Sequence, residues 1–81
     1  MDLDFRFKEG QKLSVLIYDG FSELEAETIY KTLEKNWIED TPIELRGSGF
    51  KLKIEDVEIR RIPDFETHGT HYKITVKGEL I

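Results

Sequence analysis

The sequence predicts an α+β domain in which one amphipathic helix packs on one face of an antiparallel sheet of about five or six strands. Short segments near both ends of the chain alternate apolar and polar residues, which is the period of a half-buried strand. One segment between them, from about Ser22 to Asn36, has the apolar period of a helix. The order is two strands, the helix, and then three or four strands, which form a single domain over residues 1–81.

Two strands are predicted before the helix, Leu3 to Lys8 and Lys12 to Tyr18, joined as a hairpin at Glu9-Gly10. Alternation places on the core side Leu3, Phe5, Phe7, Leu13, Val15 and Ile17. Leu16 and Tyr18 then point to the opposite face and form an apolar spot. We expect this spot to pair across a homodimer or to be covered by the loop from Pro63 to Thr70.

The predicted helix begins at a capping box. Ser22 is followed three residues later by Glu25, so the serine hydroxyl can accept from the Glu25 amide while the Glu25 side chain reaches back to the Ser22 amide. The residues expected to face the sheet are Ala26, Ile29, Tyr30, Leu33 and Trp37. Thr41-Pro42 prevents a longer helix, because the residue before proline avoids the helical conformation.

The chain after Pro42 is predicted to consist of strands and turns. Ile43 to Arg46 alternates, and Gly47–Gly49 makes a turn. The apolar phase then changes at Glu55-Asp56, which indicates either a tight turn or a bulge. We expect an irregular stretch from Pro63 to Thr70 before the final strand. Core-side residues of these strands are Phe50, Leu52, Ile54, Tyr72, Ile74 and Val76.

Composition excludes several classes of protein. The chain has no cysteine, so it has neither disulfides nor thiolate metal sites. Its longest apolar run, Val15-Leu16-Ile17-Tyr18, is far too short for a membrane helix. The start, Met1-Asp2-Leu3-Asp4, lacks the basic and then apolar character of a secretory signal. We therefore expect a cytoplasmic protein with no membrane partner.

Acidic residues concentrate on the predicted helix. The net charge is −5, and residues 19–44 carry the whole negative excess. Glu23, Glu27 and Glu34 lie along one flank of the apolar stripe, and Leu24 lies nearly opposite the stripe. One interpretation is a solvated face on which Glu27 pairs with Lys31. The other is a docking surface for a basic protein, with Glu23, Leu24, Glu27 and Glu34 as its contact residues.

The polar face of the sheet is predicted to be basic. Its outward residues include Arg6, Lys8, Lys51, Lys53, Lys73 and Lys77. These could follow a phosphate backbone, or they could simply keep strand surfaces soluble and protect strand edges. Single-strand binders also present aromatic rings to the bases, whereas the strand aromatics here fall mostly on the core side. Nucleic-acid binding through Lys51, Lys53, Lys73 and Lys77 is therefore the alternative hypothesis.

Residues suited to catalysis or metal binding are few. His68 and His71 follow Asp64 and Glu66, but their spacing matches no strong metal signature, and a polar turn at Gly69 accounts for them better. Arg46-Gly47-Ser48-Gly49 precedes a strand and lacks the ending of a phosphate loop. We expect no metal, no cofactor and no catalytic residues.

These observations predict a small acidic, non-catalytic module that binds another protein through a basic surface on that partner. Its size and charge are those of compact inhibitors that viruses direct against host nucleic-acid machinery, so an inhibitor of this kind is the predicted role. Homodimerisation is left open.

Overall fold

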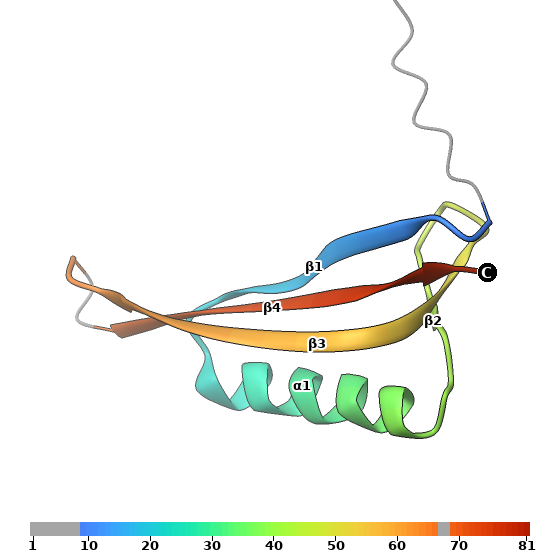
Figure 1. The fold of residues 1–81 in the computed structure, drawn as a ribbon. Coiled ribbons are helices and arrows are strands. Elements are labelled where there is room, and N and C mark those ends of the chain that lie inside the picture. The colour runs from blue at the N-terminus through green and yellow to red at the C-terminus, as the bar shows by residue number, and fades with distance from the viewer. Residues whose placement is uncertain (1–8, 67–68) are drawn as a thin grey trace, which may run out of the picture.

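The computed structural model describes residues 9–66 and 69–81. One helix lies against one face of a curled antiparallel sheet (Figure 1). The elements in chain order are β1 (Lys12–Gly20), α1 (Glu23–Ile38), β2 (Ile43–Glu44), β3 (Lys51–Asp64) and β4 (Gly69–Leu80). The strand order across the sheet is β1-β4-β3-β2. The α+β class is confirmed, but the described residues form four strands where the sequence predicted five or six. The predicted strand Leu3 to Lys8 lies outside the described residues.

A β-bulge explains part of the difference in strand number. The pairing of β3 with β4 shifts between Ile54 and Asp56, so Glu55 is an extra residue in one continuous strand. Of the two alternatives for Glu55-Asp56, the structure therefore has the bulge. The extra residue keeps both Ile54 and Val57 on the face that α1 covers, although they are separated by two residues.

The hairpin between β3 and β4 is longer than predicted. Pro63 pairs with Thr70 and Asp64 with Gly69, so the expected irregular stretch from Pro63 to Thr70 is wrong at these four residues, while Phe65 and Glu66 lie in the turn. Proline is tolerated here because β2 pairs with β3 only near Leu52, which leaves the other edge of β3 without a neighbouring strand among the described residues.

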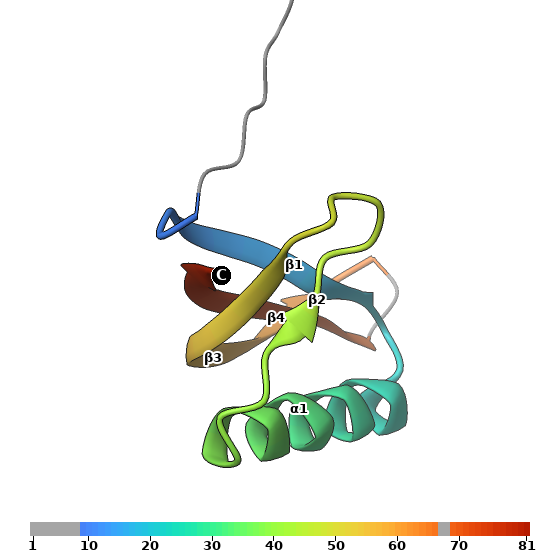
Figure 2. The same ribbon diagram turned by 90° about the vertical axis from the view of Figure 1, so that its right-hand side faces the viewer.

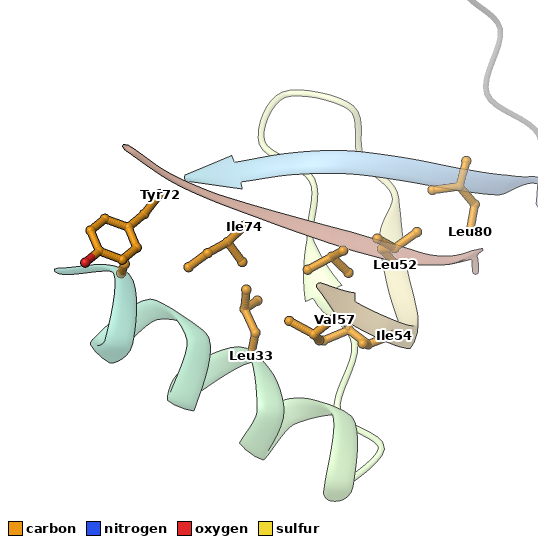
Figure 3. Close-up of a cluster of buried hydrophobic side chains, with 9 residues drawn as sticks. Leu33, Leu52, Ile54, Val57, Tyr72, Ile74 and Leu80 are labelled. Atoms are coloured by element: carbon orange, nitrogen blue, oxygen red, sulfur yellow. The ribbon is translucent and has the colours of Figure 1, made fainter. Parts of the chain in front are cut away.

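The core lies between α1 and the inner, helix-facing side of the sheet (Figure 3). Of the residues predicted to face the core, seven are buried: Ala26, Leu33, Leu52, Ile54, Tyr72, Ile74 and Val76. Val15, Ile17 and Ile29 are half-buried against this cluster, whereas Phe5 and Phe7 lie outside the described residues. Leu33 points from α1 toward Ile74 and Val57, and so joins the helix to both long strands.

Gly78 lies at a close approach of β3 to β4. It stands in β4 between Leu13 of β1 and Ile54 of β3. A Cβ atom at this position would overlap the carbonyl oxygen of Lys53 and lie 2.9 Å from Cγ of Leu52. The backbone of β3 thus passes close to β4 at this residue. Figure 2 shows the strands of the curled sheet crossing one another over α1. Only glycine fits without a shift of the backbone.

α1 ends in a Schellman motif rather than at the predicted Thr41-Pro42 stop. The Thr41 amide donates to the Asn36 carbonyl at 2.8 Å, and the Asp40 amide donates to the Trp37 carbonyl at 3.2 Å. Asp40 has the left-handed conformation that this motif requires, with φ of 55°. The helix therefore runs to Ile38, two residues beyond the predicted end at Asn36.

Candidate protein-binding surface

The start of α1 is fixed to β1 by a tyrosine. Ser22 Oγ accepts from the Glu25 amide at 3.2 Å, which is one half of the predicted capping box. In the other half, Tyr18 takes the place of the Glu25 side chain. The Ser22 amide donates to the Tyr18 hydroxyl at 3.2 Å, and that hydroxyl lies 3.2 Å from Glu25 Oε2, to which it can donate. The first turn of α1 is thereby held against the end of β1.

This arrangement corrects the predicted orientation of Tyr18. The register of β1 shifts between Leu16 and Tyr18, which makes Ile17 a bulged residue. Tyr18 therefore faces the helix and packs against the core, and the prediction that it shares the outer face with Leu16 is wrong. Leu16 does point outward and is 52% exposed. The proposed apolar spot is reduced to Leu16.

The acidic flank, which we define as Glu23, Glu27 and Glu34, lies on the exposed side of α1. At 3.6 residues per turn these three positions fall within about 40° of one another. Within the part of the chain that the structure describes, none of the three forms an ion pair. The expected pairing of Glu27 with Lys31 is thus not formed. The carboxylates face solvent without a cationic partner among the described residues.

Two exposed aliphatic side chains lie beside these carboxylates. Leu24, near the start of α1, is 76% exposed, and Ile38, at its end, is 75% exposed. Both lie on the side of the helix turned away from the sheet, separated by about 21 Å along the axis at 1.5 Å per residue. The sequence pattern indicates Leu24 but not Ile38, because the predicted helix ends before Ile38. We call these two residues together with the acidic flank the α1 surface.

A groove of about 360 Å³ runs between α1 and β3 beside this surface. It is lined by Glu27, Tyr30, Lys31, Ile59 and Arg61. Arg61 lies on the inner face of β3, opposite Tyr72. The groove therefore offers an apolar floor with charges of both signs at its rim, next to Glu27 of the acidic flank.

The outer face of the sheet is less basic than predicted. Each of the four lysines of the alternative hypothesis lies directly opposite an acidic residue on a neighbouring strand. The pairs are Lys51 with Glu44, Lys53 with Glu79, Lys73 with Asp19, and Lys77 with Asp56. Opposite charges at facing positions attract each other and lower the net field of the face. Arg6 and Lys8 lie outside the described residues.

Lys12 forms an ion pair that spans this outer face. Its Nζ donates to both carboxylate oxygens of Glu55 at 2.7 Å and lies 3.7 Å from Glu79 Oε2. The hydrogen bond with Glu55, together with the charges of Glu55 and Glu79, raises the pKa of Lys12 above its ordinary value. The bulge of β3 thus supplies a carboxylate that reaches across β4 to β1.

An aromatic pair that sequence reasoning missed lies at the other end of the outer face. The ring of Phe21 stacks on the ring of His71 with centroids 4.9 Å apart, and His71 Nε2 also contacts Asp19 Oδ1. Ile62 lies opposite His71 on β3 and is partly exposed. Phe65, in the β3–β4 turn, is 86% exposed. Phe21 and Phe65 stand outside the periodic segments, so no sequence pattern indicated their exposure.

The residues considered for a metal site are not gathered in the described part of the chain. His68 lies outside it, and the contacts of His71 are with Asp19 and Phe21. Among residues 9–66 and 69–81, no group of three or more histidines, aspartates and glutamates is placed to hold a metal ion.

The helix of the described region is neither long nor apolar enough to cross a membrane. Comparison of the chain with protein-family models, with curated proteins and with solved structures finds no match.

Proposed function

We propose that this chain is a non-catalytic module that binds another protein through the α1 surface. The observation that carries the proposal is the combination of two strongly exposed aliphatic side chains, Leu24 and Ile38, with the neighbouring carboxylates of the acidic flank, which have no ion-pair partner among the described residues. An exposed leucine alone is ordinary. Apolar side chains near the two ends of a row of charges, in which Glu23, Glu27 and Glu34 outnumber Lys31 and Lys35, form the composition of a docking surface.

The partner that fits this surface is basic and has two apolar depressions about 20 Å apart, to match Leu24 and Ile38 on a helix with a rise of 1.5 Å per residue. Opposite charge across the interface would speed encounter and select the partner, while the two aliphatic side chains would supply contact area. Proteins that handle nucleic acids carry basic surfaces of this kind. Inhibition of such a protein, of the viral anti-defence type, is the role we propose on this chemistry.

The alternative, nucleic-acid binding by the outer face, has weaker support. Its four lysines each face an acidic residue, and the Phe21–His71 pair is placed beside Asp19. A phosphate backbone would meet charges of both signs there. Self-association also stays a prediction, and it no longer depends on an outward Tyr18.

Photo-cross-linking in the native host tests the proposal. A photoreactive phenylalanine analogue would be placed at Leu24 and at Ile38 in separate proteins, with Leu16 on the outer face as the comparison site. We expect the two helix positions to give an adduct with the same partner protein and Leu16 to give no adduct with that protein. The yield should fall as salt rises, because exposed charges are screened over about 8 Å at physiological ionic strength.

A matched pair of charge reversals identifies the surface. Glu23, Glu27 and Glu34 changed to Lys should abolish the adduct, whereas the same change at Glu44, Asp56 and Glu58 should leave it intact, although both variants alter the net charge equally. Circular dichroism would verify that both are folded. Loss of binding only in the second variant would contradict the proposal and place the site on the outer face. If Lys51, Lys53, Lys73 and Lys77 changed to Glu released bound nucleic acid, the alternative would replace it.

A further inference from the structure

β1 is an edge strand of the sheet, and its side away from β4 has no neighbouring strand among residues 9–66 and 69–81. The strand order places β1 and β2 at the two edges of the sheet. β2 spans only Ile43–Glu44, whereas β1 spans Lys12–Gly20 and pairs with β4 alone among the described strands (Figure 1). Natural edge strands are usually blunted by charge, proline or short length. Between Lys12 and Asp19, β1 carries no charged residue and no proline. Its regular pairing is interrupted only by the bulge at Ile17.

The side chains of β1 are complementary to a second β1 in the antiparallel direction. Pairing with β4 defines the positions along the strand and skips Ile17. Two copies of β1 can be paired antiparallel about Val15, with the bulged Ile17 of each copy left unpaired. The facing residues are then Lys12 with Asp19, Leu13 with Tyr18, Ser14 with Leu16, and Val15 with Val15 of the second copy. Lys12 and Asp19 have opposite charges, and symmetry gives this pair twice.

The faces of the two strands also agree in this register. Leu13, Val15 and Tyr18 face the core side, opposite Gly78, Val76 and Ile74 of β4. Lys12, Ser14, Leu16 and Asp19 are on the outer side. Residues that face each other across an antiparallel pair must lie on the same side of the sheet. All four facing pairs of the proposed register meet this condition.

The open edge of β1 has room for added side chains. A groove of about 460 Å³ separates β1 from the loop that follows β2. Its apolar lining is Leu13, Val15, Leu16 and Leu45. A strand added at this edge would bring Leu13 and Val15 of the second copy toward this lining and bury apolar surface on both sides of the two-fold axis.

We propose that the chain forms a homodimer in which the open edges of two β1 strands pair antiparallel about Val15, so that the two sheets become one continuous sheet. The α1 surface takes no part in this contact. Failure of the dimer would therefore leave the protein-binding proposal standing, and failure of partner binding would leave the dimer standing.

The test uses two single charge changes and their mixture. Lys12→Asp would set two acidic pairs against each other in a homodimer, and Asp19→Lys would set two basic pairs. Multi-angle light scattering over a concentration series should show a dimer for the original chain and a dissociation constant at least about tenfold higher for each variant. An equimolar mixture should recover the dimer. In the mixed dimer, positions 12 and 19 of the Lys12→Asp variant are both acidic, and they face positions 19 and 12 of the Asp19→Lys variant, which are both basic.

Recovery in the mixture separates the proposal from a folding defect. Lys12 and Asp19 also contact Glu55 and His71 within the chain, so each variant could lose stability for that reason alone. A chain that fails to fold cannot restore dimers in its partner. Lys53→Asp, which makes the same charge change on β3, should leave the dimer intact. A monomer at every concentration, or a mixture that stays monomeric, would overturn the proposal.

Discussion

Asp40 ends α1 in a conformation that most side chains avoid. Its φ of 55° lies in the left-handed region, where a Cβ atom costs about 1 kcal/mol and aspartate is only better tolerated than most residues. Asp40→Gly should therefore raise the free energy of unfolding by roughly 0.5–1 kcal/mol. Urea titration followed by circular dichroism would measure the change. Asp40→Ala, which keeps a Cβ atom, should not stabilise the protein. Equal effects of both changes would mean that the gain came from removing the charge.

Gly78 is the residue on which close strand packing depends most. A methyl group there would overlap the carbonyl oxygen of Lys53, and backbone cannot move aside as a flexible side chain can. We expect Gly78→Ala to lower the free energy of unfolding by about 3 kcal/mol or more, as overpacking of a core does at its upper range. Chemical denaturation would measure this loss in the free energy of unfolding. Gly47→Ala is the comparison, because that position has open space and only the strain of its φ of 79°. A smaller loss for Gly78→Ala than for Gly47→Ala would contradict this account.

At the level of elements, the start of α1 depends on the Tyr18 hydroxyl. Tyr18→Phe keeps the ring against the core but leaves the Ser22 amide without its partner, and should cost about 1 kcal/mol. Tyr30→Phe is the control, since the Tyr30 hydroxyl has no hydrogen bond to the described residues and its loss should change little. Thermal unfolding of both variants measures the difference. Similar losses would mean that the Tyr18 hydroxyl contributes nothing to the cap.

The helix was the element that the sequence predicted best. The S-x-x-E pattern located Ser22 as the N-cap, and the apolar period gave the buried face. The end was placed two residues early, because the Schellman motif depends on the backbone of Asp40 and not on a proline. The exposure of Glu23, Leu24, Glu27 and Glu34 followed from the same period, so the acidic flank was predictable.

The strands were predicted less well because their faces depend on bulges. At Glu55-Asp56 charged residues interrupt the apolar pattern, so the sequence showed that the alternation changes phase there. At Ile17 the neighbours on both sides are apolar, and a run without alternation carries no information about register. The outward orientation wrongly predicted for Tyr18 follows from this. The acidic neighbours of the lysines were also hidden, since they depend on which strands pair.

At the scale of the whole molecule, the ion pair of Lys12 with Glu55 joins β1 to β3 across β4. The pKa of Lys12 is raised above its ordinary value of 10.5 in the folded chain, so the protonated form favours folding. This contribution is fully present below the unfolded pKa and is lost as pH rises through the folded pKa.

A comparison with Glu55→Gln would reveal that loss. The difference in free energy of unfolding between the two proteins should be constant near neutral pH and should shrink at pH values above the ordinary lysine pKa of 10.5. Denaturant titrations across the alkaline range would measure it. A difference that widened with rising pH would show that the ion pair is not its source.

The strand order has a consequence for how the chain folds. β3 and β4 are neighbours in the sequence, whereas β1 pairs with a strand that follows it only after α1, β2 and β3. Closing a long loop costs more entropy than closing a hairpin, so the β3–β4 hairpin should form in the transition state and β1 should join later. Stopped-flow kinetics should give a φ-value near one for Val57→Ala and near zero for Val15→Ala. On the ribosome the apolar strand β1 emerges before its partner exists, and it must wait there unpaired until β4 has been synthesised.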